Sequence, residues 1–380
     1  MAALTEEQSL IRDQAKSWAT EQAPVSAFRK VRDSNVEARY EPQTWQSMVE
    51  MGWTGILVPE AFGGSDLGYL TFGVVLEELG RQLTASPLLA SGLVGTSALL
   101  LGGNDAQQQA FLPALVDGSQ ILTLAVDDGP RHAPTNVALP AKATDAGFEL
   151  SGTKTFVLEG MAATTFVVAA RTSGAAGDTQ GISLFLVPAD AAGVSRSAMH
   201  TVDSRGYAQV SFAGVAVSAD AVLGDVDNGF ALLEQILDRG RAGLGAEMLG
   251  TSAQAFDMTL DYLKTREQFG RVIGSFQALG HRAAELFSSL ELARSVTEGA
   301  LQTLDAGGDP GSVAEMSSLS KCRVGECLQR MSNQLIQIHG GIGMTDEFDA
   351  GLYLKRARAL EATFGNRAFH RDRYATALGF

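Results

Sequence analysis

The hydrophobic pattern of this chain changes its period twice, and this order limits the possible folds more than any other feature. Near both ends, apolar residues recur at three- and four-residue steps, which predicts helices; short β-branched and aromatic runs in the middle predict antiparallel strands. The expected helices are 42–51, 69–83, 105–116, 229–265, 275–305 and 312–338, and the expected strands include 121–126, 165–170 and 182–187. We therefore predict an α+β, multi-domain protein with an N-terminal α-helical domain (1–118), a β domain (119–224) and a C-terminal helical bundle (225–380).

Charge and cysteine content limit the partners and the compartment. The chain has 29 basic and 43 acidic residues, a net charge of −14, which argues against nucleic acid or an anionic membrane as a partner. Its two cysteines, Cys322 and Cys327, rule out a disulfide framework, because five helical residues rise by about 7.5 Å. Glu6 and Glu7 stand where a signal peptide would be basic, and the apolar stretch 88–101 is shorter than a membrane span. We expect a cytoplasmic protein.

Several common catalytic motifs are missing from the sequence. There is no phosphate-binding loop that ends in Gly-Lys-Ser/Thr, no nucleophile elbow, and no HExxH or CxxC pair. The five histidines do not have metal-ligand spacing, so no metal site is expected. The strands do not alternate with helices, which argues against a doubly wound dinucleotide-binding fold.

Three strings, in order along the chain, resemble the acyl-CoA dehydrogenase family. They are MGWTGILVPE at 51–60 with LEELGR at 76–81, TREQFGRVIGSFQ at 265–277, and QIHGGIGMT at 337–345. The resemblance covers nearly the whole chain, and it implies the family's helical domain, antiparallel β-barrel domain and four-helix bundle. It also implies an FAD-dependent oxidoreductase: a glutamate removes the α-proton of an acyl-CoA, and the β-hydride passes to flavin N5. The product is a trans-2-enoyl-CoA, and an electron-transfer flavoprotein takes the electrons.

The second and third strings match the residues that hold the outer part of FAD. Arg266 matches the pyrophosphate arginine, a planar and permanently charged group suited to that dianion. Gln268 and Phe269 match residues beside the pyrophosphate and the adenine. Gln337, Gly340 and Gly341 match a turn whose backbone can approach the adenosine half of FAD closely. In the family these groups reach the FAD of a neighbouring subunit, so the resemblance implies a homodimer, a homotetramer or an α2β2 heterotetramer.

The position of the catalytic base departs from the family pattern. The usual glutamate position falls on Phe364, and the less common one, just before the family arginine that Arg241 matches, falls on Gly240. The remaining candidate is Glu247, two helical turns beyond Gly240 and about 10.5 Å along the axis. No Lys or Arg stands at 243, 244, 250 or 251 to pair with it. We predict Glu247 as the base, with a solvated or cross-helix paired carboxylate as the alternative.

Residues around the thioester and the flavin ring also follow from the resemblance. Asp238 and Arg241 match residues that contact the thioester arm of CoA; the alternative is an exposed charge pair. The N–H of Phe364 corresponds to the backbone N–H of the usual glutamate, which donates to the thioester oxygen in the family. At the flavin ring, Phe156 replaces a tryptophan and Leu158 replaces the threonine at N5, which leaves backbone groups of Val126 and Leu158 as the candidate contacts.

These departures leave three functions open. The first is an acyl-CoA dehydrogenase with an unusual base. The second is a non-catalytic subunit that completes an α2β2 tetramer beside a catalytic relative. The third is a flavin oxidase or monooxygenase on the same fold. The small residues Gly240, Gly243 and Gly245 favour a roomy pocket for a branched, cyclic or steroid-like acyl group.

Overall fold

The N-terminal part of the chain is helical, as predicted. A computed structural model describes residues 4–34 and 36–380. Its first elements are α1 (Glu6–Gln22), α2 (Val25–Asp33), α3 (Pro42–Glu50), η1 (Trp53–Gly55), η2 (Glu60–Phe62), α4 (Gly68–Arg81), η3 (Leu89–Gly95), α5 (Thr96–Gly102) and α6 (Asp105–Val116). Thr5 caps α1: its hydroxyl accepts a hydrogen bond from the Gln8 N–H, and its own N–H donates to the Gln8 side chain.

The middle of the chain forms two four-stranded sheets. The strands are β1 (Leu122–Ala125), β2 (Ala141–Thr144), β3 (Gly147–Val157), β4 (Thr165–Arg171), β5 (Ile182–Pro188), β6 (Val194–Ala198), β7 (Ala208–Ser218) and β8 (Val222–Leu223). One sheet has the order β1-β4-β5-β8 and the other β2-β3-β7-β6, with a hydrophobic core between them. The pairings are antiparallel, as predicted, apart from β1 and β4, which pair in parallel.

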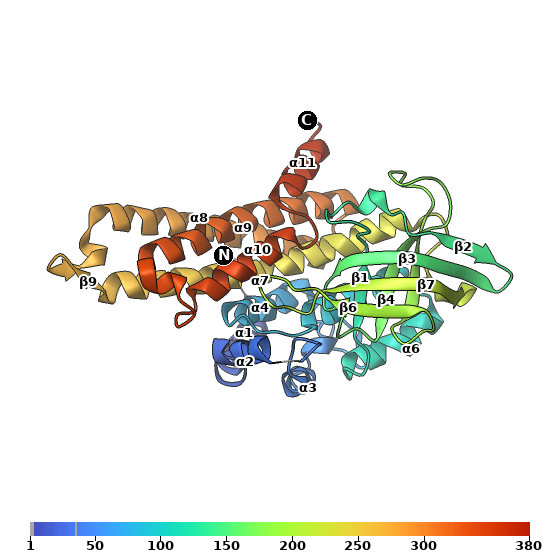
Figure 1. Ribbon diagram of the computed structural model, residues 1–380, viewed down its shortest axis with the longest axis horizontal. Helices are drawn as coiled ribbons and strands as arrows, with labels where there is room; N and C mark the ends of the chain where they lie inside the picture. The colour runs from blue at the N-terminus through green and yellow to red at the C-terminus, as the bar shows by residue number, and fades with distance from the viewer. Residues whose placement is uncertain (1–3, 35) are drawn as a thin grey trace.

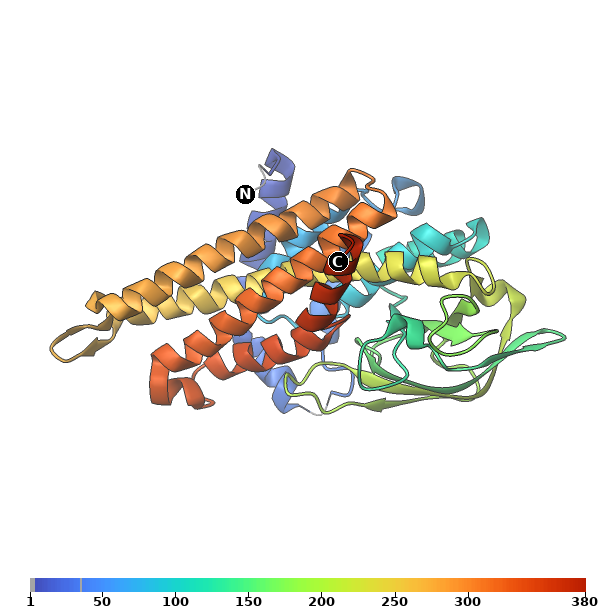
Figure 2. The ribbon, with the colours of Figure 1, turned by 90° about the horizontal axis from the view of Figure 1, so that it is seen from above.

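The C-terminal part is a bundle of long helices. Its elements are α7 (Gly229–Thr265), β9 (Glu267–Gln268), β10 (Arg271–Val272), α8 (Gln277–Asp305), α9 (Pro310–His339), η7 (Gly340–Met344), α10 (Ala350–Ala362) and α11 (Arg367–Ala377). Figures 1 and 2 show α7, α8, α9 and α10 side by side, with the N-terminal helices against α7. The predicted α+β architecture is therefore confirmed, while the limits 1–118, 119–224 and 225–380 remain our proposed division. Across the described residues, the helices are too short or too polar to cross a bilayer.

Two glycines fix α4 against α7, the helix that carries Asp238, Arg241 and Glu247. A Cβ atom on Gly80 would overlap the carbonyl oxygen of Glu247, and one on Gly250 would overlap that of Glu77. Glycine is therefore required where the two backbones meet. The apolar stretch 88–101 is buried beside them in η3 and α5, so it serves as interior packing.

Candidate active site

The residues assigned to the FAD pyrophosphate and adenine lie at the end of the molecule opposite to the β domain. There the β9–β10 hairpin joins α7 to α8 (Figure 1). Its two turn residues, Phe269 and Gly270, have φ angles of 55° and 75°, as in the two-residue type I′ turn. A phenylalanine in this conformation is uncommon. Its side chain is 91% exposed, so the turn presents an aromatic ring to the outside.

Arg266 and Gln268 lie beside this ring. Arg266 directly follows α7 and is exposed, and its guanidinium has no hydrogen-bond or ion-pair partner among the described residues. A cavity of about 440 Å³ opens beside it, with Tyr262 and Ile338 in its wall. We call Arg266, Gln268 and Phe269 the outer edge.

The third string meets the outer edge at the same end of the bundle. The ring of Tyr262 stacks on His339 with 4.1 Å between centroids, which holds the end of α9 against the end of α7. On the exposed surface beside this stack lie Gln337, Gly340 and Gly341. A Cβ atom on either glycine would meet no atom within 4 Å. All six residues assigned to the outer part of FAD thus lie at this end of the helical bundle, and their role toward the cofactor remains a prediction.

The two positions that lack a carboxylate, Gly240 and Phe364, lie next to each other. Phe364 follows α10 with a φ angle of 55°, and its ring would lie 3.1 Å from a Cβ atom on Gly240. Its carbonyl oxygen accepts hydrogen bonds from Arg241 Nε at 3.2 Å and His370 Nε2 at 3.0 Å. The corner that carries the base in relatives is therefore held firmly, with an aromatic ring in place of the carboxylate.

Asp238 and Arg241 form a buried pair, so the alternative of an exposed charge pair is wrong. Arg241 Nη1 lies 2.9 Å from Asp238 Oδ1, and the two residues are 0% and 2% exposed, respectively. Arg241 Nη2 lies 3.1 Å from His132 Nε2, and Arg373 binds both oxygens of Asp238 at 2.7 and 2.8 Å. These contacts connect α7 with α11 and with the loop after β1.

Glu247 is buried and paired across helices. Its Oε1 accepts hydrogen bonds from Arg356 Nε at 3.0 Å and Nη2 at 2.6 Å, while Arg356 Nη1 donates to Asp203 at 2.6 Å. Burial lowers the pKa of Arg356, but Glu247 and Asp203 outweigh that effect and raise it well above its usual range. The carboxylate thus has the cross-helix partner of the alternative interpretation, and its catalytic role remains a prediction.

The residues expected at the flavin ring are engaged with their own chain. Lys154 Nζ donates to the Val126 carbonyl at 2.7 Å, and Thr123 Oγ1 donates to the Leu158 carbonyl at 2.6 Å. Phe156 stacks on Tyr207 with 4.3 Å between centroids. Tyr207, which directly precedes β7, was missed from the sequence, because nothing local marks it as the residue that packs on Phe156.

Lys321 is another residue that sequence reasoning missed. Its buried ammonium donates to the carbonyls of Leu360, Glu361 and Gly365 at 2.9, 3.2 and 3.1 Å. Burial lowers its pKa to about 7, although the charge of Glu361 acts in the opposite direction. Lys321 therefore caps α10 and fixes the corner at Phe364.

The low pKa of Lys321 predicts a stability that rises with pH. The unfolded state, with a lysine pKa of about 10.4, binds more protons than the folded state above pH 7. We expect this site to add about 2 kcal/mol to the free energy of unfolding between pH 7 and pH 9. Lys321→Met removes this rise but also leaves three carbonyls without their donor. Urea unfolding of both proteins across this range tests the difference in slope, and parallel curves would contradict the prediction.

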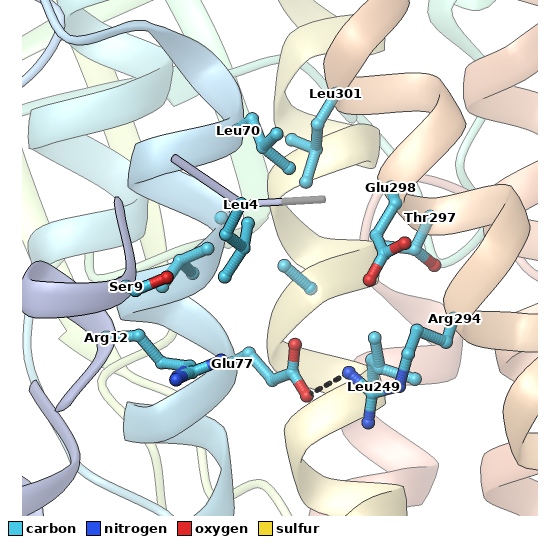
Figure 3. A pocket seen from close by; sticks show the side chains of 13 residues that line it. Leu4, Ser9, Arg12, Leu70, Glu77, Leu249, Arg294, Thr297, Glu298 and Leu301 are labelled. Atoms are coloured by element: carbon cyan, nitrogen blue, oxygen red, sulfur yellow. Dashed lines mark hydrogen bonds and ion pairs between the residues drawn. The ribbon is translucent and has the colours of Figure 1, made fainter. Parts of the chain in front are cut away.

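A separate cavity of about 230 Å³ lies where α1, α4, α7 and α8 meet. Figure 3 shows its charged end, where Arg294 Nη1 lies 2.6 Å from Glu77 Oε1. Its apolar end is formed by Leu4, Leu70 and Leu301. Ala246 and Leu249 of α7 face this cavity, so it is distinct from the one that Glu247 lines. This ion pair crosses the cavity and joins α4 to α8, which accounts for the charges of Glu77 and Arg294.

Comparison with known proteins decides the family. The N-terminal, middle and C-terminal domain models of acyl-CoA dehydrogenase match residues 5–119, 129–215 and 227–379. Mitochondrial isovaleryl-CoA dehydrogenase of Solanum tuberosum is 31% identical over 358 residues, 87% of this chain and 82% of that protein. The chain belongs to the acyl-CoA dehydrogenase family. It is therefore a member of a family of FAD-binding oxidoreductases in acyl-CoA metabolism.

Solved structures give the same family fold. A structure reported for the electron transferring flavoprotein of Acidaminococcus fermentans matches with a TM-score of 0.90 and 26% identity, over 100% of this chain and 99% of that one. The ChsE4–ChsE5 complex of Mycobacterium tuberculosis matches with a TM-score of 0.89 and 26% identity, over 99% and 98% of the two chains. The chain thus matches both structures over 99–100% of its length.

Proposed function

We propose that the chain is a subunit of an enzyme that dehydrogenates an acyl-CoA thioester to a trans-2-enoyl-CoA, with FAD as the oxidant. The observation that carries this proposal is the outer edge: an unpaired guanidinium at Arg266 and a bare ring at Phe269, both exposed beside a cavity. An electron-transfer flavoprotein is the proposed electron acceptor, supported by the similarity to the Acidaminococcus structure. The free thiols of Cys322 and Cys327 fit the reducing cytoplasm.

The outer edge has the chemistry needed for the ADP half of FAD. Arg266 offers a charge-assisted, two-pronged donor to a phosphate, and Phe269 offers a face on which adenine stacks. Gly340 and Gly341 leave open space for close approach of the adenosine. When bound, FAD supplies the acceptor for the substrate hydride. Because the outer edge lies at the far end of the molecule from the β domain (Figure 1), it serves the cofactor of another subunit.

On the substrate side, Arg241 and Asp238 orient the corner that faces the thioester. Arg241 donates to the Phe364 carbonyl and so helps to fix this corner, and we propose the Phe364 N–H as the donor to the thioester oxygen. The buried Asp238 balances the charge of Arg241. These residues position the corner. On this first candidate, in which the chain has its own reacting site, we propose Glu247 as the group that removes the α-proton.

The proposed base is tested with Glu247→Gln. A general base contributes about 10²–10⁴-fold to the rate, so the assembled enzyme should keep its FAD and lose acyl-CoA-dependent bleaching by that factor. Glu77→Gln is the matched control, because Glu77 is also an ion-paired carboxylate but lines the other cavity. A Glu247→Gln enzyme that bleaches within threefold of the wild-type rate would rule out this base and leave Glu247 as the partner of Arg356.

The second candidate, a non-catalytic subunit of a heterotetramer, is favoured by a specific observation. The space where relatives hold the reacting carbons, beside Gly240, contains the Phe364 ring and Val94, both 3.1 Å from a Cβ atom built on that glycine. Leu89 and Leu93 crowd Gly243 in the same way, so the roomy pocket predicted from these glycines is wrong. In this second candidate function, the chain does not catalyse the reaction itself; its outer edge helps to bind the FAD of a catalytic subunit. Similarity to the ChsE4–ChsE5 complex, which contains two named components, supports this arrangement.

A further inference from the structure

The site for a flavin ring in this chain should lie between two walls. One wall is the end of β3, with Phe156 and Leu158, and the other is the corner at Thr363 and Phe364. The structure allows a direct test of whether a three-ring isoalloxazine fits between them.

Tyr207 joins these two walls. Phe156 lies at a bulge in β3 with a φ angle of 52°, and its ring stacks on Tyr207 at 4.3 Å with 15° between the planes. Bulges re-aim a side chain in this way. The Tyr207 hydroxyl lies 2.7 Å from Thr363 Oγ1, and Tyr207 is 0% exposed. One aromatic ring with its hydroxyl therefore spans the gap from β3 to the corner.

The space that remains beside Tyr207 is small. The adjoining cavity, which Leu158, Glu247 and Arg356 line, holds about 20 Å³. That is enough for about one water molecule, whereas ligand pockets of cofactor size have about 300–1,000 Å³. The walls of this cavity also include Glu159 and Arg205, both buried, so opening it would expose or unpair charges.

The backbone acceptors on the β side are also in use. The Val126 carbonyl accepts from Lys154, whose ammonium is itself 2.8 Å from Asp128 Oδ1. The Leu158 carbonyl accepts from Thr123. Both carbonyls are therefore occupied by donors of this chain, and Tyr207 bridges the two walls, so the residues present do not fit the ring half of FAD.

We infer that Tyr207 closes the flavin-ring site of this chain, so that the FAD held by its outer edge places its isoalloxazine in a partner of different sequence. This inference rests on the second candidate of the proposed function, in which Glu247 is the partner of Arg356 and not the base, and it adds where the cofactor lies. The partner is a member of the same family with an open ring site and a carboxylate base. Each pair of chains then holds one FAD, with the ADP half on this chain and the reacting ring on the other.

Riboflavin tests the ring site alone, because it lacks the ADP half that the outer edge binds. We expect the wild-type chain, purified alone, to leave riboflavin fluorescence unquenched up to the solubility limit of the probe. Tyr207→Ala removes the ring between the walls and should raise riboflavin affinity by about tenfold or more. Tyr207→Phe keeps the ring and loses only the hydroxyl, so it should behave as the wild type. Circular dichroism and thermal melting verify that the variants fold.

Two results would overturn the inference. Wild-type chain that binds riboflavin as tightly as Tyr207→Ala would show that the site is open. A Tyr207→Ala chain that folds but gains no affinity would show that Tyr207 is not the closing group. Failure of the proposed function would be different: FAD would then bind to no assembly that contains the chain, whatever the riboflavin result.

Discussion

Replacing Arg356 with leucine should lower the free energy of unfolding by about 3–5 kcal/mol, the usual cost of removing one partner of a buried ion pair. Arg356 is 5% exposed and binds both Glu247 and Asp203, which are 8% and 3% exposed. Without it, two buried carboxylates would lose the cation that hydrogen-bonds both of them. Denaturant unfolding with an unchanged m-value measures the loss.

The same helix offers a matched control. Arg358 lies two residues further along α10, is exposed, and donates to Asn333 at 2.8 Å. Arg358→Leu should therefore change the stability by no more than about 0.5 kcal/mol. Arg356→Met combined with Glu247→Gln should recover part of the loss, because removing both charges leaves fewer unpaired groups. An Arg356→Leu protein as stable as the wild type would show that this network does not hold the fold.

Replacing Arg266 with alanine should weaken FAD binding by the assembled enzyme by about 100-fold. Hydrogen bonds to charged groups contribute about 1.5–3 kcal/mol each, and Arg266 has no other partner within the described residues of its own chain. The stability of the fold should not change, because the side chain is exposed. Titration of FAD into the deflavinated assembly, followed by flavin fluorescence, measures the affinity.

Arg271→Ala is the control for general charge effects at this end. Arg271 is in the same hairpin and equally charged, but its guanidinium stacks on Phe276 at 4.0 Å. We expect less than a threefold change in FAD affinity. Equal losses for both variants would mean that the hairpin attracts the cofactor only by its net charge.

The long-range partners explain what the sequence could not predict. Helix 229–265 was predicted correctly because its period of apolar residues is local to the helix. Glu247, however, pairs with Arg356, 109 residues away, whereas helical spacing marks only partners on neighbouring turns of the same helix. Likewise, the glycines at 240 and 243 predicted free space, but Phe364 and η3 fill it from distant parts of the chain.

Strand pairing shows the same limit within the β domain. Residues 121–126 were predicted as a strand from their composition, yet the parallel pairing of β1 with β4 depends on the path of the chain between them. The stack of Phe156 on Tyr207 depends on a bulge in β3 that no local signal marks. Arg266, Gln268 and Phe269 were assigned by the family resemblance, and they lie together because they are close in sequence and on one hairpin; their role toward FAD remains a proposal.

The flavin content of the assembled enzyme is the most direct test of the central claim, that this chain holds the outer half of FAD while its own ring site is closed. Absorbance near 450 nm, divided by the protein concentration of the purified complex, gives the number of cofactors per chain. We expect one FAD for every two chains, and we expect the Arg266→Ala complex to lose this FAD. One FAD for every chain, or a chain that is yellow and fully loaded when purified alone, would contradict it.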